Sequence, residues 1–263
     1  MSRKSKPRQS LPSQPTKHAP QAQSLPPGSP ALEAAPPVEV DPRRKLMARF
    51  LWWGLLLLPA AALVLPWDTA VARSIGPDSD FWGGEFRKMI HLSESFAHGT
   101  GVILISLGLF ALDPVRRWKF GLPMAVALLA GSLCNVFKGT IIARTRPHAF
   151  DLDLSVWDSF GSPLPIFWDA GYELTASEFQ SFPSGHAATA AGFCVALTFF
   201  YPRARWFFLL MLSLACLQRI VAGSHFPSDV LVGTAVGFSL AALYVWFAPE
   251  RWAERASRIV PIR

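Results

Sequence analysis

Six apolar stretches of 17 to 19 residues constrain the fold of this chain more than any other feature of its sequence. A helix needs roughly 20 apolar residues to cross the hydrocarbon core of a bilayer. The pattern therefore predicts an all-α membrane protein, with a bundle of six transmembrane helices inside a domain at 46–250. The stretches cover residues 50–67, 96–112, 120–137, 184–200, 206–222 and 230–248.

The composition fits a membrane protein better than a soluble one. Charged residues make up 16% of the 263 residues, whereas soluble domains usually contain about a quarter. Most of the ten tryptophans lie near the ends of apolar stretches, as in the aromatic belts at membrane surfaces. By contrast, residues 1–45 hold ten prolines and predict a disordered, basic tail. Residues 251–263 predict a short basic tail in the cytoplasm.

The distribution of Lys and Arg predicts the orientation. With six spans, 18 of the 25 basic residues fall on one side of the membrane, and basic flanks usually stay in the cytoplasm. Both termini are therefore expected in the cytoplasm, most simply at a bacterial inner membrane, with segments 68–95, 138–183 and 219–229 facing the periplasm or exterior. Because the basic residues flank apolar stretches rather than forming one polar face, a nucleic-acid partner is not expected.

Polar residues at the ends of the stretches gather on the predicted outward side. Charged groups at membrane depth are costly and usually functional, so we expect them to form one site. They come from three separate segments: Lys138, Arg144 and Arg146; Ser184, Gly185 and His186; and Arg219, His225 and Asp229.

The cations of this set suit an anion with several oxygens. Lys138, Arg146 and Arg219 have no carboxylate close by in the sequence, and the guanidinium fork of Arg matches phosphate. Ser184 and Gly185 open a predicted helix, where free backbone N–H groups favour an anion. One acidic group among several cations is a poor divalent site, so neither a metal nor another cofactor is expected.

The two histidines supply the reactive groups. His225 and His186 are candidates for nucleophile and general acid. Asp229 follows His225 by one helical turn and is expected to accept the proton of its Nδ1, leaving the other ring nitrogen free.

The pattern Lys138…Arg146-Pro147, then 183–186 as Pro-Ser-Gly-His, then Arg219-x5-His225-x3-Asp229 resembles the signature of the type 2 phosphatidic acid phosphatases. That superfamily also contains the vanadium haloperoxidases, and the resemblance covers about residues 90–250. It implies a six-helix bundle that hydrolyses a phosphomonoester or pyrophosphate without a metal.

The resemblance also implies a role for each residue. His225 would attack phosphorus and become phosphohistidine, oriented by Asp229, while His186 would protonate the leaving alcohol and then help to activate water. The oxygens of the phosphoryl group would be held by Lys138, Arg146, Arg219, the Ser184 hydroxyl and the Gly185 amide.

Two departures from the family pattern stand out. Seven residues rather than six separate Lys138 from Arg146. Arg144 is the alternative phosphate ligand, although an anchoring or supporting role is the preferred interpretation. Gln218 stands where the pattern has serine, and we expect only a small effect from it.

The sequence predicts a membrane phosphatase acting on a lipid phosphate such as a phosphatidate-like lipid, a polyprenyl pyrophosphate or a lipid-anchor phosphate. A transferase passing phosphate between lipids, and a non-catalytic membrane protein, remain open as alternatives. Residues 80–93 predict an interfacial helix. The acidic segment 147–183 is interpreted as a solvated loop rather than a lid.

Overall fold

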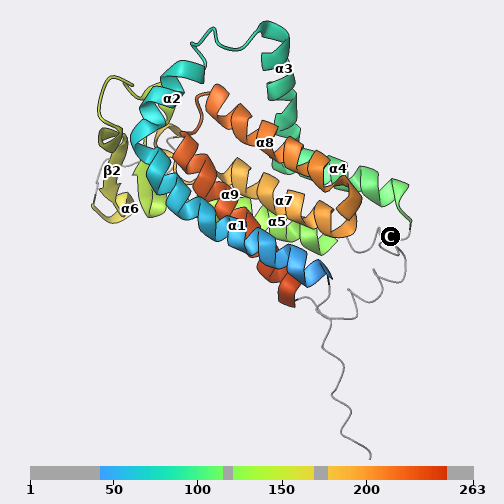
Figure 1. Cartoon of the computed structure of the whole chain (residues 1–263). Coiled ribbons are helices and arrows are strands. Elements are labelled where there is room, and N and C mark those ends of the chain that lie inside the picture. The colour runs from blue at the N-terminus through green and yellow to red at the C-terminus, as the bar shows by residue number, and fades with distance from the viewer. Residues whose placement is uncertain (1–41, 115–120, 169–176, 248–263) are drawn as a thin grey trace, which may run out of the picture. The chain divides into compact units, whose positions relative to one another are not determined.

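The computed structural model describes residues 42–114, 121–168 and 177–247, and helices dominate them (Figure 1). The longer helices are α1 (Pro42–Val64), α4 (Gly99–Leu112), α5 (Gly121–Thr140), α7 (Gly185–Phe200), α8 (Arg205–Val221) and α9 (Pro227–Phe247). The short helices are η1 (Leu65–Trp67), α2 (Asp68–Ile75), α3 (Gly84–Leu92), η2 (Ser93–Phe96), η4 (Pro147–Ala149), η5 (Val156–Ser159), α6 (Pro165–Trp168), η6 (Ser177–Phe179) and η7 (Pro202–Ala204). Strands β1 (Ile142–Arg144) and β2 (Phe160–Pro163) pair antiparallel.

Each predicted apolar stretch coincides with one of the six longer helices, but not all of these helices pass as membrane spans on their own. Three helical segments in the described part of the chain are long and apolar enough to cross a bilayer: Met47–Ile75, Pro202–Val221 and Pro227–Tyr244. A fourth qualifies if the pair Gly84–Phe96 and Gly99–Leu112, which is bent by 73°, counts as one span. The apolar helices at Met124–Lys138 and Gly185–Phe200 are shorter.

The ends of the predicted domains lie mostly outside the described residues. Helix α1 begins at Pro42, so the last residues of the tail predicted over 1–45 are helical. The remainder of that tail and the segment 251–263 are not among the described residues.

Helix α7 lies at the centre of the packing. It contacts α5, α8 and α9, while α1 packs along α9, and Figure 1 shows these helices side by side. Small residues make this possible, because a Cβ on Gly192 would lie 3.0 Å from the Cα of Ala127 on α5. Close approach at small residues is a common way to pack helices in membranes. Helix α7 therefore packs closely against α5 at this point and joins α5, α8 and α9 into one bundle.

The shorter elements gather at one end of the helices. Figure 1 shows α2, α6 and β2 at the end where α9 begins, and α3 rising beside α8. The interfacial helix predicted at 80–93 corresponds to α3, on which Phe86, Met89 and Leu92 are exposed. Elements that connect the helices on this side thus surround the segments that carry the candidate site.

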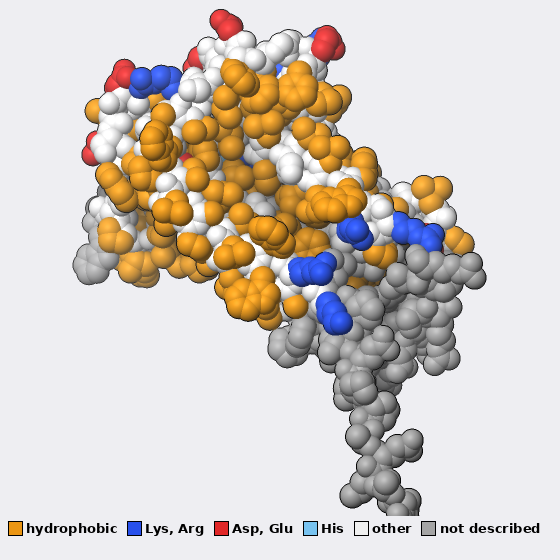
Figure 2. All heavy atoms as spheres, viewed as in Figure 1, with side chains coloured by type: hydrophobic (Ala, Val, Ile, Leu, Met, Phe, Trp, Pro, Cys, Tyr) orange, Lys and Arg blue, Asp and Glu red, His pale blue; other side chains and the backbone are white. Residues whose placement is uncertain are grey.

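The surface separates charges by sign. Figure 2 shows hydrophobic side chains over most of the visible face, with most of the acidic side chains gathered at the α2–α3 end. Most of the visible Lys and Arg side chains gather at the opposite end, near the starts of α1 and α8, whereas Arg73 and Lys88 pair with acidic residues at the α2–α3 end. Large apolar side chains such as Trp52, Trp53 and Leu104 are more than half exposed, as expected of helices that face lipid.

Candidate active site

The start of α7 brings the second predicted segment to the site. The Ser184 hydroxyl caps the helix by accepting a hydrogen bond from the Ala187 N–H (3.3 Å), which leaves its own proton free to donate. Gly185 follows at a close contact between helices, because a Cβ there would lie 2.4 Å from Asn135 Oδ1 on α5. A larger residue at 185 would therefore disturb the α5 side of the site.

The turn between α8 and α9 carries His225. The α8 helix ends at Val221, and Gly223 adopts a φ of +64°, a conformation that glycine accepts without strain. The Ser224 and His225 N–H groups both donate to the Arg219 carbonyl, at 3.1 and 3.2 Å. This local turn fixes the imidazole close to the last turn of α8, where Arg219 lies.

The second and third segments are joined directly. The Ser184 N–H donates to the Asp229 carbonyl at 3.0 Å, and α9 approaches closely because Gly233 has no Cβ: one there would lie 2.2 Å from the Ser184 carbonyl oxygen. Residues more than 40 positions apart therefore share one wall of the site.

The predicted hydrogen bond from His225 to Asp229 is wrong. His225 Nδ1 instead lies 2.6 Å from the Ser181 carbonyl oxygen, and Asp229 Oδ2 is 4.0 Å away. A carbonyl can only accept, so Nδ1 carries the proton and Nε2 keeps the free electron pair of the neutral ring. The main chain before α7, rather than the carboxylate, orients His225.

Asp229 is occupied by other donors, which explains the difference. It accepts hydrogen bonds from the Ser181 hydroxyl (2.6 Å) and the Phe226 N–H (2.9 Å), and it is paired with Arg144. Through Ser181, Asp229 still holds the segment whose carbonyl binds His225. Its observed contacts are those of a support for the imidazole.

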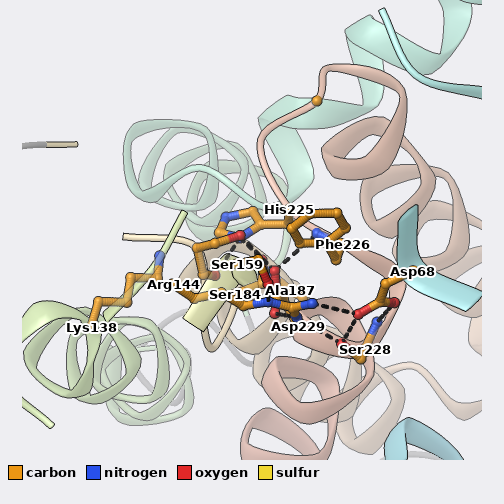
Figure 3. Close-up of polar contacts among 12 residues, drawn as sticks. Asp68, Lys138, Arg144, Ser159, Ser184, Ala187, His225, Phe226, Ser228 and Asp229 are labelled. Atoms are coloured by element: carbon orange, nitrogen blue, oxygen red, sulfur yellow. Dashed lines mark hydrogen bonds and ion pairs between the residues drawn. The ribbon is translucent and has the colours of Figure 1, made fainter. Parts of the chain in front are cut away.

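Arg144 is completely buried and lies between two carboxylates (Figure 3). It forms ion pairs with Asp229 and with Asp68 on α2, the latter at 2.8 Å. Its guanidinium lies over the rings of Phe160 and Phe226, with centroids 4.4 and 4.2 Å away. These contacts agree with the preferred interpretation of Arg144 as a supporting residue and leave it no free face for a phosphate.

Three cations converge on His225. Burial lowers the pKa of His225 well below its usual value, and the charges of Lys138, Arg219 and Arg146 lower it further, against the effect of the hydrogen bond to the Ser181 carbonyl. The imidazole is therefore neutral at neutral pH, as a nucleophile must be. Burial and the charge of Arg219 also lower the pKa of Arg146, whereas Asp229 raises it.

The same cations have unused hydrogen-bonding capacity. Nε of Arg146 and Nε of Arg219 are buried and have no hydrogen-bond partner in the described part of the protein. Lys138 is only 4% exposed and donates to Asn135 at 3.2 Å. Buried donors without partners are rare, and cationic donors form their strongest hydrogen bonds with an anion.

Sequence reasoning missed three contributors. The Ser181 carbonyl has no side-chain signal, and Asp68 lies far from the motifs in the sequence. Glu94, in η2, accepts a hydrogen bond from Arg219 at 2.7 Å and lies 4.0 Å from His186. Gln218, the departure from the serine of the pattern, donates to Glu94 at 3.3 Å and accepts from Arg219 at 3.1 Å.

The described residues contain no group of three or more His, Cys, Asp and Glu side chains arranged to hold a metal ion.

A family model of the PAP2 superfamily matches residues 120–253, which include all three segments of the site. The chain belongs to the PAP2 superfamily.

Curated relatives of this PAP2 chain include two proteins named lipid A 1-phosphatase. The one from Rhizobium etli is 30% identical over 155 residues, which are 55% of this chain and 60% of the relative. The one from Rhizobium johnstonii is 32% identical over 136 residues, 48% of this chain and 50% of the relative. This chain thus matches about half to three fifths of their length.

A third relative is the bacitracin transport permease protein BcrC of Bacillus licheniformis. It is 33% identical over 73 residues, covering 27% of this PAP2 chain and 35% of the relative. No solved structure matches the chain.

Proposed function

We propose that this PAP2 chain is an integral-membrane phosphatase that removes phosphate from a lipid through a phosphohistidine at His225. The observation that carries the proposal is the pair of buried, unpartnered guanidinium nitrogens, Nε of Arg146 and Nε of Arg219, beside a neutral imidazole. A phosphoryl group would satisfy both donors while meeting the nucleophile.

In the proposed mechanism, His225 Nε2 attacks phosphorus and the bond from phosphorus to the leaving oxygen breaks. His186 gives a proton to that oxygen. Burial and the charges of Arg219 and Lys138 lower the pKa of His186 to about 3 in the free site, so the negative charge of the bound substrate raises that pKa before the transfer. The ring of His225 becomes positive as the N–P bond forms. The Nδ1–H group stays hydrogen-bonded to the Ser181 carbonyl oxygen, 2.6 Å from Nδ1, and this hydrogen bond strengthens as the ring gains charge. Lys138, Arg146 and Arg219, with the Ser184 hydroxyl and the Gly185 amide, hold the phosphoryl oxygens.

The second half of the reaction returns the enzyme to its starting state. His186, now neutral, takes a proton from water as the water oxygen attacks phosphorus. The N–P bond breaks, inorganic phosphate leaves, and His225 regains its electron pair at Nε2. Positioning and electrostatic stabilisation are most of what phosphoryl transfer requires, so the mechanism uses no metal.

A lipid substrate fits the setting of the site. The segments that carry it lie at helix ends, where the phosphate of a lipid would sit while its chains remain in the bilayer. Two relatives that share up to 60% of their length with this chain are named lipid A 1-phosphatase. The separation of acidic and basic side chains in Figure 2 supports a site on the periplasmic or exterior side and termini in the cytoplasm.

The decisive test is release of inorganic phosphate by the purified full-length protein in detergent, with a panel of lipid phosphates and no acceptor lipid. The His225→Ala variant should lose about 10³-fold or more of this activity, because the nucleophile is gone. The control Lys88→Ala, at an exposed residue of α3 that pairs with Glu85 one turn away, should stay within about threefold of wild type.

Trapping distinguishes the mechanism from its rivals. Acid-labile, base-stable phosphoprotein should form from labelled substrate in the wild type and not in His225→Ala. Phosphate transfer that requires a second lipid would indicate a transferase. Equal background release by both proteins would contradict a catalytic role, and loss of activity with a chelator would contradict the metal-free mechanism.

A further inference from the structure

Glu94 places a carboxylate at the edge of the cationic site. It lies in η2, next to the 73° break that separates α3 and η2 from α4. Its Oε1 accepts a hydrogen bond from Arg219 Nη1 at 2.7 Å and lies 4.0 Å from His186 Nε2. The Glu94 side chain is 40% exposed, whereas that of Arg219 is 8% exposed. The carboxylate is therefore partly exposed while it contacts Arg219 and lies close to His186.

Gln218 fixes this carboxylate in place. Its Nε2 donates to Glu94 Oε2 at 3.3 Å, and its Oε1 accepts from the same Arg219 nitrogen that binds Glu94. A serine, as in the family pattern, is too short to span both partners. The longer amide thus holds Glu94 and Arg219 together, so that the carboxylate is oriented before substrate arrives.

His186 determines which part of a substrate meets Glu94. Under the proposed function, His186 protonates the oxygen that leaves phosphorus, so the first atoms of the leaving group lie against its ring. Glu94 lies on that ring's Nε2 side, and the ring centroid of His98 is 5.5 Å from that of His186. The leaving group therefore contacts Glu94 and the histidines, whereas the transferred phosphoryl group contacts the cations.

We propose that Glu94 selects the leaving group, favouring the phosphomonoester of a polyol or amino sugar lipid over a lipid diphosphate. An ionised carboxylate only accepts hydrogen bonds, so it binds hydroxyl or N–H groups next to the scissile bond. When a lipid diphosphate is cleaved, the leaving group is a lipid monophosphate anion. The Glu94 carboxylate, 4.0 Å from His186 Nε2, repels that anion. The three cations hold the transferred phosphoryl group of both substrates alike and do not discriminate. This inference rests on the proposed function, because His186 locates the leaving group.

The test compares wild type and Glu94→Gln on two substrates in detergent: a glycolipid with a phosphomonoester on its sugar, and a polyprenyl diphosphate. Wild type should favour the sugar phosphomonoester. In Glu94→Gln, kcat/KM for the sugar substrate should fall and that for the diphosphate should stay constant or rise. The ratio of the two should change about 10- to 100-fold, the effect of one hydrogen bond to a charged group.

Glu85→Gln is the matched control, since Glu85 on α3 is exposed and pairs with Lys88 one turn away; its ratio should equal that of wild type. Glu94→Asp, which keeps the charge, should still disfavour the diphosphate and provides the same readout if Glu94→Gln does not fold.

Three results would overturn the inference and leave the proposed function intact. They are an equal loss on both substrates, as a merely structural support of Arg219 would give, a wild type that prefers the diphosphate, and a Glu94→Asp variant that prefers it. A wild type that releases phosphate from no lipid would instead overturn the proposed function itself.

Discussion

Arg144 connects three parts of the protein through its guanidinium group and its main-chain carbonyl. Its side chain pairs with Asp68 and Asp229, and its carbonyl oxygen accepts a hydrogen bond from the Ser181 N–H at 3.0 Å. Arg144 therefore holds Ser181, whose carbonyl orients His225, in two ways. It accepts a hydrogen bond from the Ser181 N–H, and it pairs with Asp229, which binds the Ser181 hydroxyl. A buried cation between two carboxylates is stable only while all of these partners remain.

Replacing Arg144 by Met should leave two buried carboxylates without their common partner. We expect a loss of about 3–5 kcal/mol in the free energy of unfolding, measured by thermal or denaturant unfolding in detergent. Arg73→Met is the control, because Arg73 pairs with Asp153 at an exposed position and should cost less than about 1 kcal/mol. Similar effects of the two changes would contradict the structural role of Arg144.

The residues with chemically distinctive side chains were predictable from the sequence. Lys138, His186 and His225 were identified as candidates by type and spacing, and their catalytic roles stay predictions; the charge of Lys138 contributes to lowering the pKa of His225. The contact at Ser181 was not predictable, because its acceptor is a main-chain oxygen that every residue possesses. Asp68 and Glu94 belong to segments outside the motifs, and only the packing of the helices brings them to the site.

At the scale of elements, the contact between α9 and the start of α7 sets the geometry of the site. Gly233 lies against the carbonyl oxygen of Ser184, which cannot move without disturbing the cap of α7. The apolar stretches predicted the existence of these helices but not their close approach, because the sequence does not say which face of a helix meets its neighbour.

The Gly233→Ala variant should force α9 and α7 apart at the site. We expect the free energy of unfolding to fall by about 1–3 kcal/mol because of overpacking. Vanadate, a phosphate mimic that binds the site, should also stabilise the variant against unfolding less than it stabilises wild type. Gly108→Ala is the control: Gly108 lies within α4 with open space around it, and alanine there should be neutral or stabilising by up to about 1 kcal/mol. A stable Gly233→Ala protein with unchanged vanadate binding would contradict this assignment.

The break before α4 was not predicted. The stretch at 96–112 is mostly apolar, yet α4 begins only at Gly99, where His98 caps the helix by accepting from the Thr100 N–H. Gly101 lies so close to Ser95 that a Cβ there would be 1.9 Å from its carbonyl oxygen. Hydrophobicity reports that a segment is buried or lipid-facing, whereas a bend of this kind depends on local capping and contact with a preceding turn.

At the scale of the whole molecule, the charge asymmetry in Figure 2 predicts which side each loop occupies. A cysteine introduced at the exposed Ser155 should react with a membrane-impermeant maleimide in intact cells. A cysteine at the exposed Arg203, in the short helix η7 before α8, should react only after the membrane is permeabilised. The reverse pattern would place the site in the cytoplasm. The native Cys134 and Cys194 are buried and should contribute little background.

His225 receives its orientation from a main-chain oxygen contributed by a residue 44 positions away. A related chain with another amino acid at 181 would keep the carbonyl acceptor for His225 and lose only the hydroxyl contact to Asp229. Evolutionary variation at that position is thus compatible with an unchanged reactive nitrogen. A comparison of sequences that weights only invariant letters would overlook the contact on which the direction of attack depends.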